Sequence, residues 1–471
     1  MMKKTVCALL AFVLFAACVP GTAAAYSGEA VVEGEIFGGA AGDKIPVAVS
    51  FDPAWLTERD ARVYDPELAA FSALFAADGY YREKDLAKGT QNRVLPDGSE
   101  ENYGFTSFLT AAGFNEAEHY ESFRTGNYTV DTNDSVTLTI GHAAVADRYD
   151  VYAVAIRGAF SAGEWRSAFD PGCEGGDYEA LTGAHPEWTD RVNLKSMDVA
   201  ANRTMAFIGD YMAQTGDASR EKRILVTGHS RGGGIANLIG AAFESAGEVV
   251  SYTYTFNTPG VTCAKDTARY ETVFNVFDSA DLFTDILPFG EGSPVRYGRD
   301  LSVAVADSEE IRSALAALKG RDDYACVSAE TAERYRTLFG ERFPGREALY
   351  KPETVTRTFA TSEEAEAGRE ACLALIGAEA GLGIEGLCSA GEIVREADGS
   401  YTYTFTYCGA ALLQAYSMIL AYGEAAYTPV ITLFAEDETA CAIAAILHEN
   451  ADAFSAGHIL VNSYVIAGML A

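Results

Sequence analysis

The sequence has few basic residues and, after its first 25 residues, no long apolar run. A membrane-spanning helix requires about 18–20 consecutive apolar residues, and the last apolar run, at 459–471, is too short. Lys and Arg number 35 against 67 Asp and Glu, which gives a formal net charge of −32. Because this charge would repel a phosphate backbone, we expect no nucleic-acid partner.

Metal-binding patterns are also absent from the cysteines. The 471 residues include nine cysteines, and seven remain once Cys7 and Cys18 of the N-terminal segment are set aside. These seven have none of the close paired spacings of a zinc site. We therefore expect buried free thiols, and the sequence implies neither a metal ion nor an organic cofactor. The length and the 49% hydrophobic content predict one large globular domain with an insertion.

The N-terminal segment, residues 1–25, has the pattern of a secretory signal peptide. Two lysines precede an apolar run at 6–18, and three alanines follow at 23–25. We predict cleavage after Ala25 and a secreted protein. The alternative is lipoprotein processing at Cys18, although the usual leucine three residues before that cysteine is missing.

The sequence is organised around residues 223–244, RILVTGHSRGGGIANLIGAAFE, where an aliphatic run meets a serine between glycines. We predict a strand, a sharp turn at Ser230 and a helix, with Gly228 and Gly232 making room for the turn. This pattern is the Gly-x-Ser-x-Gly nucleophile elbow, which exposes the serine hydroxyl at the carboxyl end of a strand. The next amide, that of Arg231, lies at a helix N-terminus, where the helix dipole favours an oxyanion.

A second predicted strand, 149–156, ends at Arg157-Gly158-Ala159. Hydrolysis of a carboxylester needs two N–H donors to the oxyanion, and the second commonly comes from the loop after a neighbouring strand. We therefore predict that the Ala159 amide is the second donor. The segment that follows, 160–188, holds Trp165 and Trp188, two of the three tryptophans, and we interpret it as a lid or an acyl-binding wall.

Further patterns predict the rest of the core. β-prone stretches occur within 31–51, a helix is expected at 66–81 and a loop at 85–101. Other expected elements are a short element at 108–113, a strand at 135–140, an amphipathic helix at 194–212 and strands at 249–256 and 273–277. The order strand, helix, strand before Ser230 implies a right-handed parallel crossover, with the site beyond the carboxyl ends of the strands.

A serine nucleophile needs a histidine base and a carboxylate that orients it. If the triad follows the order Ser, Asp, His, the six histidines reduce to His448 and His458. The segment after the strand at 273–277 offers three carboxylates, those of Asp278, Asp281 and Asp285. The pattern alone leaves these alternatives open.

Taken in order, several motifs resemble those of the class 3 lipases of the α/β-hydrolase superfamily. The matching pieces are Ile156-Arg157-Gly158-Ala159 with Glu164-Trp165 downstream, His185, Gly228-His229-Ser230-Arg231-Gly232-Gly233, Asp281-Leu282-Phe283 ahead of Pro288, and His458 followed by Tyr464. The resemblance implies an α/β-hydrolase fold, with a central, mostly parallel sheet flanked by helices. It further implies Ser230 as nucleophile, Asp281 as orienting acid and His458 as base, with the amides of Ala159 and Arg231 as oxyanion donors. Ala159 stands where the family usually has threonine, which removes a hydroxyl but keeps the N–H.

Residues 301–440 separate the predicted acid from the predicted base by more than such lipases usually need. This stretch is rich in Ala, Glu and Leu, with helices predicted at 308–319, 360–380 and 410–421. We expect a mainly helical cap inserted into a core of residues 26–300. Residues 441–471 would then return to the core with His458.

The sequence thus predicts a secreted serine carboxylester hydrolase, a lipase or esterase that acts through an acyl-enzyme. Its partner would be an ester or lipid substrate, met in transient contact with a lipid interface. One alternative is another serine hydrolase on the same fold, such as a phospholipase, thioesterase or peptidase, because a fold does not fix the scissile bond. The other is a surface binding protein without catalysis.

Overall fold

The structure is a computed structural model of the chain. It describes residues 29–37, 44–80, 92–94, 100–102, 107–114, 116–124, 135–159, 164, 193–320, 327–377, 388–451, 458 and 460–470. The predicted signal peptide, Cys18 and His185 lie outside these residues, as does the predicted lid at 160–188 except for Glu164.

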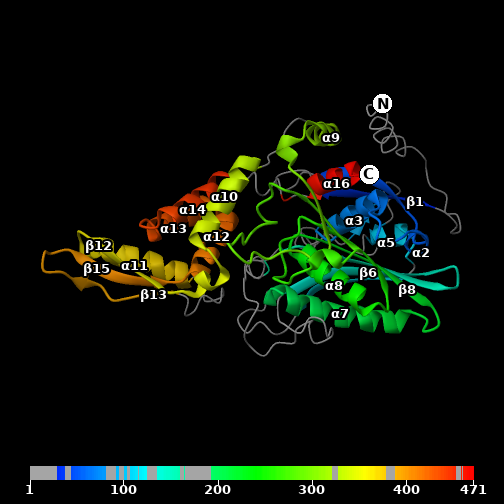
Figure 1. Cartoon of the computed structure of the whole chain (residues 1–471), viewed down its shortest axis with the longest axis horizontal. Helices are drawn as coiled ribbons and strands as arrows, with labels where there is room; N and C mark the ends of the chain where they lie inside the picture. The colour runs from blue at the N-terminus through cyan, green and yellow to red at the C-terminus, as the bar shows by residue number, and fades with distance from the viewer. Residues whose placement is uncertain are drawn as a thin grey trace.

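A seven-stranded mixed sheet forms the centre of the core (Figure 1), with its strands in the order β11-β10-β9-β8-β7-β6-β5. The strands are β5 (Glu116–Arg124), β6 (Ser135–Val145), β7 (Tyr149–Ile156), β8 (Glu221–His229), β9 (Val250–Phe256), β10 (Val273–Asp278) and β11 (Arg299–Val303). Neighbours from β7 to β11 run parallel, whereas β6 is antiparallel to both of its neighbours. The strands expected before and after Ser230 are all present, and with its helices the sheet makes an α/β fold.

Helices cover both faces of this sheet (Figure 1). The helices α7 (Lys195–Thr215) and α8 (Arg231–Ala246) pack on one face, and α3 (Pro66–Asp78) and α16 (Leu460–Met469) pack on the other. Alternate side chains of β7 enter the two layers, with Tyr152 and Val154 on the α7–α8 side and Val151 and Ala153 on the α3–α16 side. Strands buried on both faces have uninterrupted apolar runs, which explains why the sequence around 149–156 and 224–227 does not alternate.

The N-terminal part of the chain adds a hairpin and short helices to the α3 layer. The strands β1 (Ala30–Phe37) and β2 (Lys44–Phe51) pair antiparallel and pack with α3, and α2 (Trp55–Glu58) and α5 (Ser107–Ala111) lie nearby. The helix α3 begins after Asp65, whose side chain accepts from two amides of the first turn. The prediction of a loop at 85–101 was wrong in part, because β3 (Asn92–Val94) pairs with β4 (Glu100–Asn102). This short hairpin is polar and gives no apolar alternation in the sequence.

The described residues within 327–449 form a second lobe beside the sheet (Figure 1). Before the lobe, the chain contains η2 (Thr267–Arg269), which precedes β10, and then η3 (Val305–Asp307) and α9 (Glu309–Lys319), which follow β11. The helix α9 packs on α16. The lobe contains α10 (Ala329–Arg342), η4 (Arg346–Tyr350), β12 (Glu353–Phe359), α11 (Ser362–Gly377), β13 (Cys388–Ala390), β14 (Val394–Arg395), β15 (Tyr401–Tyr407), α12 (Gly409–Tyr422), α13 (Glu424–Leu433) and α14 (Glu438–Glu449). The last strand of the main sheet, β11, ends at Val303, which lies within the predicted cap of 301–440. The helix α14 spans residue 440, where that cap was expected to end.

The expectation of a mainly helical cap missed a second sheet. The helices predicted at 308–319, 360–380 and 410–421 correspond to α9, α11 and α12, with 378–380 outside the described residues. Between them, β12, β15 and β13 form an antiparallel sheet in that order, and β14 also pairs with β15. The sequence of β15, YTYTFTY, alternates aromatic residues with threonine, and this β-prone pattern outweighed the helix-forming composition around it.

The lobe and the main sheet share one apolar core. The cluster on the α7–α8 side continues through Phe289, which follows β10, to Phe339 and Phe343 of α10 and its end. The rings of Phe289 and Phe339 lie 5.8 Å apart. In the lobe, Cys408 carries a buried free thiol, as expected, whereas the free thiol of Cys441 is only half-buried.

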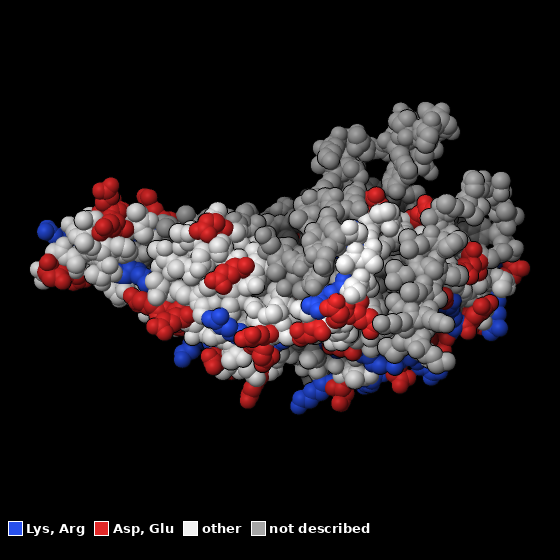
Figure 2. All heavy atoms as spheres, turned by 90° about the horizontal axis from the view of Figure 1, so that it is seen from above, with Lys and Arg blue, Asp and Glu red and all other residues white. Residues whose placement is uncertain are grey.

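Acidic side chains are spread over the surface. On the face shown in Figure 2, Asp and Glu lie over both the lobe and the core, with Lys and Arg between them. Among the helices that the structure describes, none is long and apolar enough to cross a membrane.

Candidate active site

Ser230 lies at the sharp turn between β8 and α8. Its backbone has φ 56° and ψ −128°, in a region that non-glycine residues rarely adopt. A Cβ on Gly232 would lie 2.2 Å from the Ile156 carbonyl oxygen, and one on Gly228 would lie 2.3 Å from the Gly232 carbonyl oxygen. Glycines are therefore required on both sides of the serine, as the elbow pattern predicts.

The chain after β7 passes close to this turn. A Cβ on Gly158 would lie 3.0 Å from the Cβ of Ser230, so the backbone leading to Ala159 lies against the serine. Ala159 is buried, and Arg231 is the first residue of α8, where amides have no acceptor within their own helix. A buried ion pair between Arg157 and Glu164, 3.2 Å apart, holds this part of the chain in place.

Asp281 and His458, which are far apart in the sequence, meet in a buried hydrogen bond. His458 Nδ1 lies 2.8 Å from Asp281 Oδ2, and the two side chains are 8% and 1% exposed. A carboxylate only accepts, so Nδ1 carries the proton. In the part of the chain that the structure describes, His458 Nε2 has no hydrogen-bond partner, although it is buried. This nitrogen can therefore accept a proton from a group that enters the site.

The other two candidate aspartates bind elsewhere. Asp278 accepts hydrogen bonds from the amides of Ala280 and Val305, at 2.9 and 3.2 Å. Burial raises the pKa of the Asp278 carboxyl to about 7. Asp285 lies 2.8 Å from Arg336 of α10. Of the three carboxylates proposed from the sequence, the one that contacts His458 in the described structure is that of Asp281.

The remaining histidines with described side chains also have other neighbours. His448 of α14 lies 3.0 Å from Glu424 and stacks on Tyr427, with ring centroids 4.1 Å apart. His142 of β6 pairs with Asp150 at the start of β7. Ser230 lies at the opposite end of the strands, after the carboxyl end of β8. The side chain of His119 lies outside the description.

Ser230 and His458 are linked through their neighbours rather than to one another. The Ser230 amide donates to the Phe256 carbonyl at 2.9 Å, which ties the turn to the end of β9. His229 Nε2 lies 2.7 Å from the backbone oxygen of His458. The described structure contains no hydrogen bond between Ser230 and His458 Nε2. Such a bond is often long in a protein without substrate and tightens when substrate binds.

Asn257, directly after β9, is a site residue that the sequence did not reveal. Its Nδ2 donates to Asp281 Oδ2 at 2.7 Å, and its Oδ1 accepts from the hydroxyl of Ser463 in α16. Its φ of 46° is one that asparagine tolerates better than most residues. An asparagine at the carboxyl end of a buried strand was the available signal, but its partners are more than 20 residues away.

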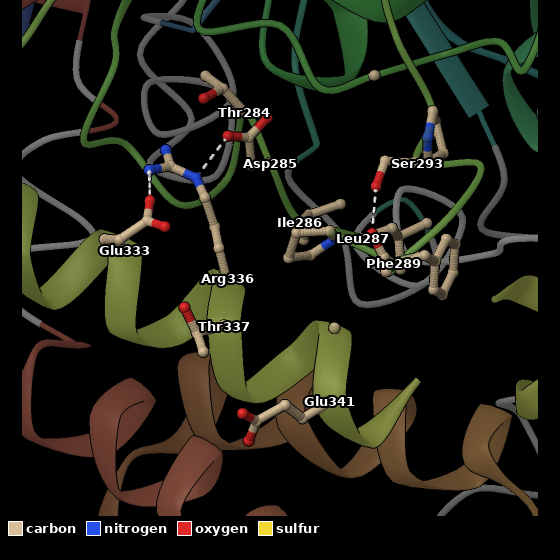
Figure 3. Close-up of a pocket in the computed structure, with 15 residues that line it drawn as sticks. Thr284, Asp285, Ile286, Leu287, Phe289, Ser293, Glu333, Arg336, Thr337 and Glu341 are labelled. Atoms are coloured by element: carbon tan, nitrogen blue, oxygen red, sulfur yellow. Dashed lines mark hydrogen bonds and ion pairs between the residues drawn. The ribbon is translucent and has the colours of Figure 1, made fainter. Parts of the chain in front are cut away.

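A cavity of about 600 Å³ lies between the lobe and the loop after β10. Figure 3 shows its two walls, with Ile286, Leu287 and Phe289 on the core side and α10 on the other. Arg336 points across the gap to Asp285, and Glu333 approaches the guanidinium at 3.7 Å. The cavity therefore adjoins the segment that carries Asp281.

The described residues thus define an α/β protein with a strained serine turn and a buried Asp–His pair. No protein-family model matches the chain, and no curated protein matches it. The solved structures to which it is similar include fungal class 3 lipases, the family that its motifs resemble. The mono- and diacylglycerol lipase from Aspergillus oryzae matches with a TM-score of 0.34 and 18% identity, over 51% of this chain and 80% of that one. The Rhizomucor miehei triacylglyceride lipase matches with a TM-score of 0.30 and 14% identity, over 50% and 79%.

No group of three or more His, Cys, Asp or Glu side chains that could hold a metal ion occurs among the described residues.

Proposed function

We propose that this chain is a secreted serine carboxylester hydrolase, a lipase or esterase, with Ser230, His458 and Asp281 as its triad. The observation that carries the proposal is the buried pair of Asp281 and His458, whose Nε2 has no hydrogen-bond partner in the described structure. A buried polar nitrogen without a partner is costly, and such groups are common where a substrate completes the site. The serine turn with its positive φ supports the same proposal.

The acylation step begins when His458 Nε2 removes the proton of the Ser230 hydroxyl. The serine oxygen attacks the ester carbonyl carbon, and the electron pair of the carbonyl moves onto its oxygen. The amides of Ala159 and Arg231 donate to this oxyanion, helped by the N-terminus of α8. Asp281 stabilises the imidazolium and keeps its proton on Nδ1. When the oxyanion collapses, His458 gives its Nε2 proton to the departing alcohol, and the acyl group remains on Ser230.

Deacylation repeats this sequence with water. His458 Nε2 takes a proton from the water while the water oxygen attacks the acyl carbon. The oxyanion forms between the same two amides. Its collapse breaks the bond to Ser230, whose oxygen recovers the proton from His458. The products are a carboxylic acid and an alcohol, and the enzyme returns to its starting state.

Hydrolysis of p-nitrophenyl esters of increasing acyl length, by the full chain and by Ser230→Ala, tests this proposal. We expect the wild type to cleave at least one ester and Ser230→Ala to lose at least about 10³-fold in kcat, because the nucleophile is removed. Equal activity of the two proteins would refute the assignment. Thioester and anilide analogues of the best acyl group distinguish an esterase from a thioesterase or peptidase.

We also propose that residues 1–25 are removed on export. The N-terminal residue of the protein recovered from the medium and from the membranes of an expressing host tests this idea. A mature N-terminus at Tyr26 is expected. An N-terminus at a lipid-modified Cys18 would instead support anchoring at the membrane surface.

A further inference from the structure

His229, the residue before Ser230, has hydrogen-bond partners at both ring nitrogens. Nε2 lies 2.7 Å from the backbone oxygen of His458, and Nδ1 lies 2.7 Å from the hydroxyl of Tyr80. Tyr80 follows α3 near the N-terminus of the described chain, so the ring of His229 joins two segments almost 380 positions apart (458 against 80). The side chains of His229 and Tyr80 take no part in the reaction steps proposed above.

The chemistry of the partners fixes the direction of these hydrogen bonds. A backbone carbonyl only accepts, so His229 Nε2 carries a proton and donates it to His458. Burial, reinforced by the nearby His458, holds the pKa of the His229 ring well below its usual value. The ring is therefore neutral, and its Nδ1 accepts from the Tyr80 hydroxyl. Burial also raises the pKa of that hydroxyl, which keeps its proton.

The same hydroxyl reaches the predicted oxyanion segment. The backbone of Gly158 lies against Tyr80, because a Cβ on Gly158 would lie only 2.0 Å from the Tyr80 hydroxyl oxygen. From this hydroxyl, hydrogen bonds run from Tyr80 to His229 and from His229 to His458. The two hydrogen bonds connect the chain at the ends of β7 and β8 to the backbone of the proposed base.

Ring contacts hold His458 at the same place. Its ring centroid lies 4.9 Å from that of His229 and 4.5 Å from that of Phe283. Asp281 fixes the Nδ1 side of the ring. Asp281 and Phe283 thus hold the side chain, and the hydrogen bond from His229 ties the backbone of His458 to the serine turn.

We infer that His229 is a positioning residue, which sets the backbone of His458 and so the approach of its Nε2 to Ser230, and that Tyr80 selects the required tautomer of His229. The inference rests on the proposed function. A misplacement of about 1 Å between reacting groups costs about 10²-fold in rate. Loss of the donor at Nε2 should therefore lower kcat and leave KM nearly unchanged.

Two substitutions of similar size separate this role from packing. In His229→Gln the side-chain amide nitrogen occupies about the place of Nε2, and it can still donate to His458. In His229→Asn the nitrogen occupies about the place of Nδ1 and reaches towards Tyr80 instead. We expect His229→Gln to keep kcat for a p-nitrophenyl ester within about threefold, and His229→Asn to lose about 10–10²-fold. His142→Asn, at a buried histidine at the opposite end of the strands, is the matched control and should keep the wild-type kcat.

A third variant tests the tautomer directly and keeps the histidine. As a single substitution, Tyr80→Phe should lower kcat severalfold. Combined with His229→Gln, it should lower kcat less, because glutamine has no tautomer to select. Equal kcat for His229→Gln and His229→Asn would overturn the inference. A rise in KM for His229→Asn with no fall in kcat would overturn it as well. In those cases ester cleavage that depends on Ser230 would still stand. If the wild type cleaves no ester, the proposed function fails, and the inference fails with it.

Discussion

Arg336 of α10 donates a hydrogen bond to the backbone carbonyl of Ser279, at a distance of 2.7 Å. Ser279 lies two residues before Asp281, and the same guanidinium also donates to Asp285 at 2.8 Å. The second lobe therefore contacts the segment of the proposed acid both before and after Asp281 in the sequence. Tyr335 adds a hydrogen bond to the Ile286 carbonyl at 3.3 Å. The lobe thus contributes to the order of the site as well as to its rim.

Arg336→Ala should lower both stability and activity. Hydrogen bonds from a charged donor are worth about 1.5–3 kcal/mol when buried, and we expect about 1–2 kcal/mol here because Arg336 is partly exposed. We also expect a severalfold loss of kcat, since the Asp281 segment becomes less ordered. Urea unfolding and ester hydrolysis measure the two effects. Arg334→Ala, at an exposed position of the same helix, is the control. Equal behaviour of the two variants would contradict a role for Arg336.

Asp281→Asn tests which carboxylate orients the base. An asparagine keeps the size of the side chain but cannot stabilise an imidazolium, and it favours the wrong tautomer of His458. The equivalent change in a serine protease lowers kcat about 10⁴-fold, and we expect a loss of similar order. Asp278→Asn and Asp285→Asn should each cost far less. A larger loss in either of those variants would move the assignment away from Asp281.

Asp278 should make the stability depend on pH. Its pKa is raised to about 7 by burial, above the value of about 3.9 for an unfolded aspartate. The folded state therefore binds more protons between these values, so this contribution is fully present below about pH 4 and is lost as the pH rises through about 7. The slope is at most about 1.4 kcal/mol per pH unit.

Asp278→Asn removes this titration and can still accept from the amides of Ala280 and Val305. We expect the free energy of unfolding of the variant, relative to wild type, to increase between pH 5 and pH 8. Urea unfolding at fixed ionic strength gives this difference. A difference that stays constant over this range would show that Asp278 has an ordinary pKa.

Gly158→Ala should inactivate the protein. The new Cβ would lie 2.0 Å from the Tyr80 hydroxyl oxygen and 2.7 Å from the His229 carbonyl oxygen, so the chain before Ala159 must move. Overpacking of this kind costs about 1–3 kcal/mol, and displacement of an oxyanion donor costs about 10²–10³-fold in kcat. Gly209→Ala is the control, because a Cβ on this exposed glycine of α7 meets nothing within 4 Å. That variant should be active and slightly more stable. Wild-type kcat in Gly158→Ala would exclude Ala159 as a donor.

The elbow and the order of the core could be predicted from the sequence because their signals are local. Gly228, Ser230 and Gly232 stand within five residues, and strands buried on both faces have unmistakable apolar runs. The choice of Asp281 over Asp278 and Asp285 depended on a resemblance, since all three lie in one segment. The structure separates them by partners that are distant in sequence, which are Val305 for Asp278, His458 for Asp281 and Arg336 for Asp285.

Other features had no local signal. The polar chain through Tyr80 and His229 depends on contacts between residues about 150 and 230 positions apart. The sheet of the lobe was missed because helix-forming residues surround β15, whose alternating pattern is short. Arg336 looks like any charged residue on a helix until α10 is placed against the loop after β10.

Covalent labelling by a fluorophosphonate, mapped by peptide mass spectrometry, tests the central claim most directly. The probe reacts only with a serine whose hydroxyl is activated by a neighbouring base. We expect one adduct per chain, on Ser230, and a labelling rate that falls strongly in His458→Ala and in Asp281→Asn. A wild-type protein that remains unlabelled, or labelling that persists in Ser230→Ala, would contradict the assignment of Ser230 as a nucleophile activated by His458.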